Sequence, residues 1–192
     1  MWRMSNRKLS ICRALVSICA FVLLLGSQSA LAVKAGSWPV GWIDQDGDCQ
    51  DTEVEVLVRD AAGLLQWGDP EACTIASGTW RSLAFDLALP MDSVLVIPLV
   101  MPGNAEASGA KKWDREHKRQ FLNDMDNLSI LDVRAAQVRA DQGPEAWQPH
   151  EKYRCLYATR WQQVKQRYKL KSSKAERAAL ETMLATCKAE TP

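Results

Sequence analysis

Histidine is scarce in this sequence, and the close cysteine pairs that hold structural metals are absent. The 192 residues include two histidines, His117 and His150, and no Cys-x-x-Cys pair. Structural zinc sites need cysteine and histidine ligands at short, clustered spacings. The sequence therefore argues against a zinc protein. It also contains no internal repeat and no low-complexity segment.

Long apolar runs are missing too, since a membrane-spanning helix needs about 20 apolar residues. The apolar run at 14–26 is shorter, follows a basic segment, and precedes "SQSALA", which has small residues before a cut after Ala32. We expect residues 1–32 to be a signal peptide and 33–192 to form one domain. The protein is then exported, to the periplasm or the medium of a bacterium, with no stable membrane anchor after cleavage.

Four cysteines remain after this cut: Cys49, Cys73, Cys155 and Cys187. An even number in an exported chain indicates two disulfides, and four cysteines allow three pairings. Pairing by region, Cys49 with Cys73 and Cys155 with Cys187, is favoured because each bond then closes a local unit. Each such loop stabilises the fold by roughly 3 kcal/mol in the chain-entropy model.

Charge is distributed unevenly along the chain. Residues 33–110 hold 3 basic and 12 acidic side chains, whereas residues 111–192 hold 17 basic and 11 acidic ones. A basic half can face a polyanion such as DNA. The alternative is that basic residues coat two exposed helices, on which acidic residues are interspersed.

Periodicity predicts an α+β fold. Residues 53–67 read as a strand or a short helix, 73–80 as a strand with a hairpin turn at Ser77–Gly78, and 93–100 as an apolar strand. A helix capped by Asp114 follows, then a strand-to-helix segment at 127–138. An apolar stripe at 153–168 predicts a long helix, and Ser173 with Glu176 forms a capping box for the last one. Cys155–Cys187 would staple these two helices into a hairpin.

The segment "DQDGDCQDTEVE" places carboxylates at calcium-loop spacing. The ligand candidates at offsets 1, 3, 5 and 12 of an EF-hand-like loop are Asp44, Asp46, Asp48 and Glu55. However, Cys49 occupies the position that needs glycine for its sharp turn. A solvated acidic turn held by a disulfide is the competing interpretation.

Seven stretches occur in an order that resembles one known family. They are "WIDQDGDCQDTEVEVL", "CTIASGTW", "MDSVLVIPL", "SGAKKWDREHKRQFLNDMDNL", "GPEAWQP", "YRCLYATRWQQVKQRYKL" and "AERAALETMLATC". From about Trp42 to Cys187 they resemble the secreted bacterial HNH (His-Me finger) endonuclease-like family with a DUF1524 / GmrSD C-terminal-type domain. The resemblance implies a ββα-metal core, in which a hairpin and a helix hold one divalent ion against a DNA phosphate. The expected fold is this core followed by the stapled helical hairpin.

The residues that the resemblance assigns to catalysis are largely replaced. The family pattern is Asp-x-Asp-His followed by a hydrophobic pair and Pro-Leu, and later an Asn-Arg-Ser-Lys-like segment. Carried across, these family positions fall on Asp92, Val94, Leu95, Ala136 and Arg139. Only the first aspartate is kept. An arginine that often follows "CQDT" in the family is Glu53 here, while the glutamate two residues later is Glu55.

Phosphodiester hydrolysis needs a general base and a cation that stabilises charge on the phosphoryl group. Histidine serves as base because its pKa lies near neutrality, and Leu95 cannot replace it. Loss of a general base costs about 10² to 10⁴ in rate. We therefore expect a catalytically inactive family member with a buried apolar strand at 93–100. No cofactor is expected, and magnesium or manganese would be bound only if activity survives.

A retained role as a binding module, for DNA or for a protein partner, is the resulting hypothesis. The candidates for phosphate contact are Lys111, Lys112, Arg115, Lys118 and Arg119, and a solvated helix face is the alternative. A second hypothesis is an active metal-dependent endonuclease whose site has moved, for example to Asp92, His150 and another carboxylate. A third is a calcium-stabilised interaction protein of the cell envelope. His117 and His150 otherwise read as surface or capping residues, and the tryptophans as packing anchors.

Overall fold

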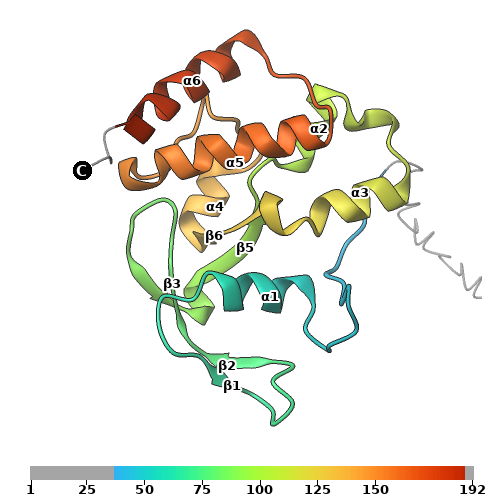
Figure 1. Cartoon of the computed structure of the whole chain (residues 1–192), viewed down its shortest axis with the longest axis vertical. Helices are drawn as coiled ribbons and strands as arrows, with labels where there is room; N and C mark the ends of the chain where they lie inside the picture. Colours follow the sequence, from blue (N-terminus) through green and yellow to red (C-terminus); the bar gives the residue numbers. More distant parts are fainter. Residues whose placement is uncertain (1–36, 189–192) are drawn as a thin grey trace, which may run out of the picture. The chain divides into compact units, whose positions relative to one another are not determined.

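The computed structural model describes residues 37–188, so the expected signal peptide lies outside the described residues. Helices and short strands are mixed along this part of the chain (Figure 1). The strands are β1 (Gln66–Trp67), β2 (Ile75–Ser77), β3 (Thr79–Arg81), β4 (Ala88–Pro90), β5 (Val94–Pro98) and β6 (Leu128–Asp132). The α-helices are α1 (Thr52–Arg59), α2 (Pro102–Ser108), α3 (Arg115–Leu122), α4 (Val133–Arg139), α5 (Arg154–Arg167) and α6 (Lys174–Leu184). Short 3₁₀ turns are η1 (Met91–Ser93), η2 (Ala110–Lys112), η3 (Met125–Asn127), η4 (Glu151–Tyr153) and η5 (Ala185–Lys188).

Four α-helices begin at side-chain caps that satisfy otherwise unpaired backbone N–H groups. The carboxylate of Asp51 accepts from the amide of Val54 at the start of α1. Asp114 and Asp132 cap α3 and α4 in the same way. Ser173 caps α6 by accepting from the amide of Glu176 at 3.0 Å. The caps expected at Asp114 and Ser173 are therefore confirmed.

The strands form three separate antiparallel pairs: β1–β2, β3–β4 and β5–β6. The β5–β6 pair is the longest, with Leu95 opposite Leu131 and Ile97 opposite Ser129. Helices α2 and α3 lie between β5 and β6 in the sequence, so this pairing is non-local. The apolar strand at 93–100 and the strand-to-helix segment at 127–138 are confirmed as β5 and as β6 followed by α4.

Two local predictions are resolved or corrected. Residues 52–59 are helical, which settles the choice between strand and helix. The prediction of a hairpin turn at Ser77–Gly78 is wrong. Strand β2 pairs with the preceding β1, and β3 pairs with the following β4. A Cβ on Gly78 would lie 2.6 Å from side-chain atoms of Leu65 and of Trp80. This glycine therefore allows close packing between two hairpins.

Two apolar clusters fill the interior of the described part. In one, Val56 of α1 packs with Trp80 and with Val96 and Ile130 from one face of β5–β6. The indole of Trp80 also donates to the carbonyl of Leu57 at 2.7 Å. The other cluster lies among α2, α3, α5 and α6 and includes Phe121, Tyr157, Trp161, Val164, Leu180 and Met183. The packing roles expected for Trp80 and Trp161 are confirmed.

Helices α5 and α6 lie side by side in Figure 1 and are joined by a disulfide. Cys155 lies in the first turn of α5, and Cys187 follows α6 in η5. The second disulfide joins Cys49 to Cys73. Both favoured pairings are confirmed, as are the stapled helical hairpin and the mixed α+β class. Among the described helices, none combines the length and apolar character needed to cross a membrane.

Candidate functional site

The positions assigned by the family resemblance lie on the unit formed by β5, β6 and α4. Strand β6 runs directly into α4, because Asp132 ends the strand and caps the helix. The Asp132 carboxylate accepts from the amide of Ala135 at 2.9 Å and from the hydroxyl of Ser82 at 2.7 Å. Helix α4 contacts both strands. The unit is thus an antiparallel strand pair followed by a helix packed against it.

The side chains at these positions differ in exposure. Val94 is buried among the apolar residues of α1 and β6, whereas Leu95 keeps 42% of its surface exposed. The expectation of a wholly buried strand is therefore wrong, because β5 alternates and presents Leu95 to solvent. Ala136 lies partly buried on α4. Asp92 is exposed in η1, where its carboxylate accepts from the hydroxyl of Ser93.

Arg139, at the position of the family lysine, is a buried structural donor. Its side chain is 1% exposed, and the guanidinium donates to the carbonyls of Pro98, at 2.9 Å, and Leu99. It also lies 5.3 Å from the ring centre of Trp147. Burial lowers the pKa of this guanidinium from its usual range. Arg139 therefore ties the end of α4 to the end of β5.

Neither histidine joins a catalytic cluster in the described part of the chain. The ring of His117 is exposed and stacks on Trp113 with centroids 4.3 Å apart. His150 caps η4, where its Nδ1 accepts from the amide of Lys152 at 3.3 Å. Within residues 37–188, the set of three or more His, Cys, Asp or Glu side chains close enough to share an ion is Asp44, Asp46 and Asp48. The displaced set of Asp92, His150 and a further carboxylate is not brought together there.

The carboxylates of the acidic turn at 44–48 lie close together. Ligand atoms of Asp44, Asp46 and Asp48 lie within 4.8 Å of one another, and all three side chains are exposed. Asp44 accepts from the amides of Gly47 and Cys49, so its carboxylate holds the turn closed. These carboxylates are the ligand type that calcium prefers.

Two further residues bear on the calcium interpretation. Cys49 adopts a φ of 77°, the left-handed conformation for which glycine is preferred at this position of the loop. Glu55 lies on α1, and the pKa of its carboxyl is raised by burial and by the charges of Asp46, Asp48 and Asp44. The four residues at calcium-loop spacing are therefore electrostatically coupled.

The basic residues proposed for phosphate contact do not form one exposed set. Lys111, Lys112 and Arg115 are exposed. The prediction that Lys118 is a surface residue available to phosphate is wrong. Its side chain is 1% exposed, and its Nζ lies 3.8 Å from a carboxylate oxygen of Glu106. Arg119 donates to both carboxylate oxygens of Glu116, at 2.9 and 2.8 Å. Three of the five candidates thus remain available to a polyanion.

The excess of basic residues after residue 110 is largely structural. Arg160 donates to three backbone carbonyls, and Arg167 pairs with Asp124 and Asp126. Lys165 is buried beside Glu176. The sequence offered two interpretations of the basic half, a surface that faces a polyanion and solvated helix faces. Neither predicts that these cations are buried or paired.

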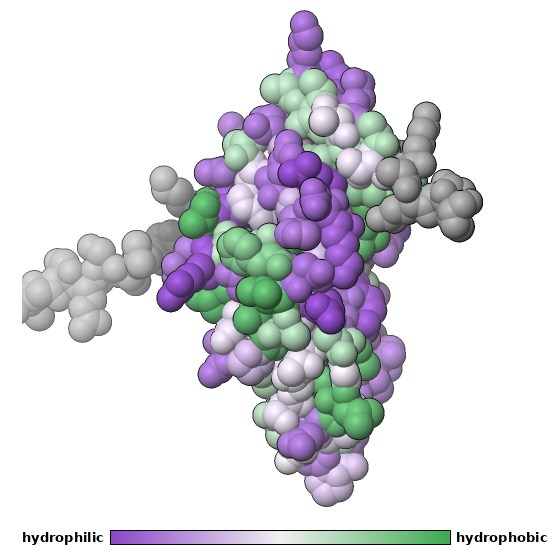
Figure 2. Space-filling view, turned by 90° about the vertical axis from the view of Figure 1, so that its left-hand side faces the viewer, coloured by the Kyte–Doolittle hydropathy of each residue, from purple (hydrophilic) through white to green (hydrophobic). Residues whose placement is uncertain are grey.

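Exposed apolar side chains are scattered over several elements. Phe85 and Leu87 protrude from the loop between β3 and β4, Val138 from α4 and Leu156 from α5, each at least half exposed. Figure 2 shows one face of the molecule, on which hydrophobic residues form separate patches between hydrophilic ones.

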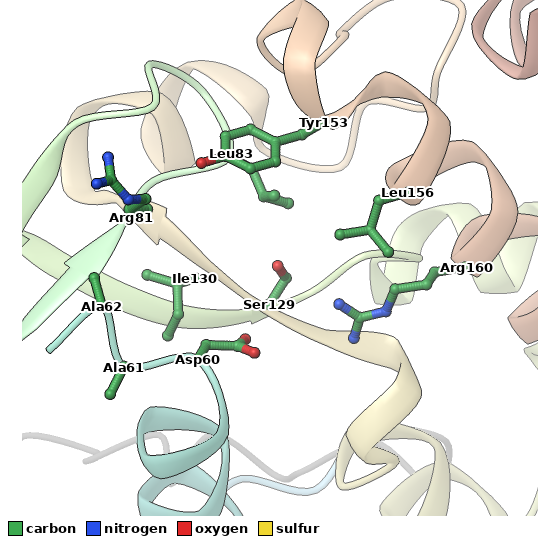
Figure 3. Close-up of a pocket in the computed structure, with 10 residues that line it drawn as sticks. All are labelled: Asp60, Ala61, Ala62, Arg81, Leu83, Ser129, Ile130, Tyr153, Leu156 and Arg160. Atoms are coloured by element: carbon green, nitrogen blue, oxygen red, sulfur yellow. The ribbon is translucent and has the colours of Figure 1, made fainter. Parts of the chain in front are cut away.

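A cavity of about 340 Å³ opens beside the edge of β6 that does not pair with β5 (Figure 3). Its apolar walls include Ala61, Ala62, Leu83 and Leu156, and its polar groups are Asp60, Arg81, Ser129, Tyr153 and Arg160. Sequence reasoning missed this site. Its residues come from four separate stretches of the chain, and none belongs to a short motif with a recognisable spacing.

Comparison with known proteins gives one informative relative. The chain is 36% identical over 153 residues to an "Uncharacterized secreted protein" of the fungus Arthroderma benhamiae. The aligned region covers 76% of this chain and 72% of the relative. No family model and no solved structure matches this chain.

Proposed function

This chain belongs to the same family as the secreted protein of Arthroderma benhamiae, and we propose that it is an exported protein with an inactive endonuclease-like core. The proposed core is a His-Me finger of the HNH type, formed by β5, β6 and α4. The proposed role is that of a binding module for DNA or for a protein partner. Export is supported by the secreted relative and by the two disulfides, which form in oxidising compartments.

The observation that carries this proposal is the strand pair followed by a helix, with apolar residues at the positions of the catalytic groups. Leu95 is exposed on β5 and Ala136 lies on the helix that packs against that strand. Neither side chain can accept a proton or bind a metal. These observations support the scaffold that the resemblance implies. The side chains that would carry out catalysis on that scaffold are replaced by apolar ones.

Restoring these groups tests the proposal. We expect no metal-dependent plasmid nicking by the oxidised unmodified protein with magnesium or manganese. The double variant Leu95→His/Ala136→Asn should nick the plasmid, and EDTA should abolish the activity. Val94 is left unchanged because it is buried and a carboxylate there would be desolvated. The matched control is Leu95→Gln/Ala136→Asn, which is polar but has no base that titrates near neutrality.

Two outcomes would contradict the proposal. Nicking by the unmodified protein would favour the alternative of an active endonuclease with displaced site residues. A double variant that unfolds at the unmodified temperature, yet neither nicks DNA nor binds manganese, would reject the assignment of these positions. Binding to DNA, where it occurs, would use the exposed side chains of Lys111, Lys112 and Arg115.

A calcium-stabilised interaction protein is the second candidate function. It is supported by the convergence of Asp44, Asp46 and Asp48 and by the coupling of Glu55 to all three. The Cys49–Cys73 bond holds this turn next to the β1–β2 hairpin, where a bound ion would rigidify the surface. The two candidates are compatible, because the acidic turn and the β5–β6–α4 unit use different residues.

A further inference from the structure

The cavity beside β6 is lined by a hydroxyl that has no hydrogen-bond partner in the described part of the chain. Ser129 is 4% exposed, and within residues 37–188 its Oγ neither donates nor accepts a hydrogen bond. Figure 3 shows this hydroxyl pointing into the space between Leu83, Tyr153 and Leu156. This oxygen is not among the fully buried polar atoms that lack a partner, so it faces the open cavity, where a ligand can replace water as its hydrogen-bond partner. The hydroxyl is therefore available to a polar group of a ligand.

Arg160 supplies a positive charge at the same cavity. Its Nε donates to the carbonyl of Asp126 at 3.2 Å, and its Nη2 donates to the carbonyls of Met125 and Leu128 at 3.1 and 2.6 Å. In the described part of the chain, Nη1 has no hydrogen-bond partner and the guanidinium forms no ion pair. Carbonyl oxygens orient a guanidinium without neutralising it, and Asp60, Asp126 and Asp124 stabilise its charge from beyond ion-pair distance. An anionic group in the cavity would give this guanidinium a direct ion pair.

Asp60 also lines the cavity and favours the charged form of Arg160, but its carboxylate forms its ion pair with another residue. Arg59 holds both of its carboxylate oxygens, with Nε at 2.8 Å from Oδ1 and Nη2 at 2.6 Å from Oδ2. The Arg59–Asp60 pair is therefore neutral as a unit. At the other end of the cavity, Arg81 is exposed and lies 3.5 Å from Asp86, which Lys152 also pairs. The lining carries an excess of positive charge.

The remaining walls are apolar. Leu83 and Leu156 face Ala61, Ala62 and the side chain of Ile130 across the space (Figure 3). The volume of about 340 Å³ is at the lower end of the range for small-molecule sites. Apolar walls with a few convergent polar groups are typical of such sites.

We propose that this cavity binds a small monocarboxylate with an aromatic or branched apolar body. One carboxylate oxygen accepts from Nη1 of Arg160 and the other from the hydroxyl of Ser129, while the body packs against Leu83 and Leu156. A single available guanidinium N–H beside one hydroxyl matches the two oxygens and single charge of a carboxylate. This ligand site is independent of the endonuclease-like assignment, since it uses none of the positions assigned to catalysis.

The test is a titration of the oxidised protein with four probes, followed by two-dimensional NMR of the backbone amides. Phenylacetate carries the proposed charge and body, phenylacetamide lacks the charge, phenethylamine reverses it, and acetate lacks the body. We expect saturable shifts around Ser129 with phenylacetate, with a Kd below about 1 mM. Phenylacetamide and acetate should bind at least about tenfold more weakly, because each loses one of the two recognition elements.

Two variants identify the site. Ser129→Ala removes the hydroxyl that faces the cavity, at nearly constant side-chain volume, and should weaken phenylacetate binding about tenfold. Leu156→Glu places a negative charge on a half-exposed wall and should abolish binding. Its matched control is Val138→Glu, at an exposed position on α4 outside the cavity, which should bind phenylacetate like the unmodified protein.

Three results would overturn the proposal. One is the absence of saturable shifts with phenylacetate at its solubility limit. Another is equal or tighter binding of phenylacetamide or phenethylamine, which would show that charge complementarity is not used. The third is unchanged phenylacetate binding in folded Ser129→Ala and Leu156→Glu variants, which would place the ligand elsewhere.

Discussion

The phenolic hydroxyl of Tyr153 donates a hydrogen bond to Oδ1 of Asp86, joining the β3–β4 loop to the turn that precedes α5. Lys152 donates to both oxygens of the same carboxylate, at 3.1 and 2.9 Å. These hydrogen bonds lower the pKa of Asp86 to about 2, and burial together with the bond to Asp86 raises the pKa of Tyr153 to about 12. The charged carboxylate is thus the form that the folded protein favours.

Stability should therefore depend on pH through Asp86. A carboxyl with a depressed pKa in the folded state stabilises the fold above its unfolded pKa near 3.8, and this contribution is lost as pH falls towards 2. We expect Asp86→Asn to lower the melting temperature at pH 7. The difference from the unmodified protein should shrink between about pH 4 and pH 2. Asparagine suits this position because Asp86 has a φ of 48°.

Thermal unfolding followed by circular dichroism from pH 2 to pH 7 measures this difference. The control is Asp92→Asn, at an exposed carboxylate that accepts from the hydroxyl of the neighbouring Ser93. A difference in melting temperature between Asp86→Asn and the unmodified protein that stays constant from pH 2 to pH 7 would contradict the proposed linkage between stability and the ionisation of Asp86.

A buried ion pair connects α5 to α6. Nζ of Lys165 lies 3.3 Å from a carboxylate oxygen of Glu176, and each side chain is 4% exposed. Glu176 also accepts from the indole of Trp161 at 2.7 Å. Removing one partner of a buried pair leaves an uncompensated charge, which costs about 3–5 kcal/mol. We expect Glu176→Gln to lower the free energy of unfolding by that order, although glutamine still provides an acceptor for Trp161.

Urea unfolding of Glu176→Gln, Lys165→Met and the double variant forms the required cycle. The double variant should be more stable than Glu176→Gln alone, because methionine removes the unpaired buried charge. Strictly additive losses would indicate that the two side chains do not interact.

Calcium should stabilise the acidic turn if the second candidate function holds. At a calcium concentration of 100 times Kd, binding to the folded state alone adds about 2.7 kcal/mol to the free energy of unfolding. We expect a rise in melting temperature with calcium that is absent in Asp46→Asn. Glu71→Gln, an exposed carboxylate outside the turn, is the control and should retain the rise. No shift at saturating calcium would reject the ion site.

Sequence periodicity predicted the larger elements well, because their signals are local. The stripe of Tyr157, Trp161 and Val164 predicts α5, and the cap at Ser173 predicts the start of α6. Pairing by region likewise gave both disulfides. The β1–β2 and β3–β4 hairpins were mistaken for one, since a Ser-Gly step marks a turn and a site of close packing equally well.

The surface was harder to predict than the elements. Lys118 follows a solvated pattern in the sequence, yet it is buried because Trp38 and Glu106 come from distant segments to contact it. Arg139 was assigned to the position of the family lysine and Arg160 was not singled out, but both serve as donors to backbone carbonyls. Such contacts depend on tertiary structure, so neither spacing nor charge count reveals them. The cavity at Ser129 could not be predicted from the sequence for the same reason.

The disulfide between Cys155 and Cys187 has a consequence for proteolysis. It closes a covalent ring around α5, α6 and their connection, in which Lys169 and Lys171 are exposed. A trypsin cut at either lysine would open the backbone but leave both fragments attached through sulfur. The nicked protein would run as one chain on a non-reducing gel and separate only after reduction. Outside the cell, where proteases are common and thiols scarce, the two helices would stay tethered after such a cut.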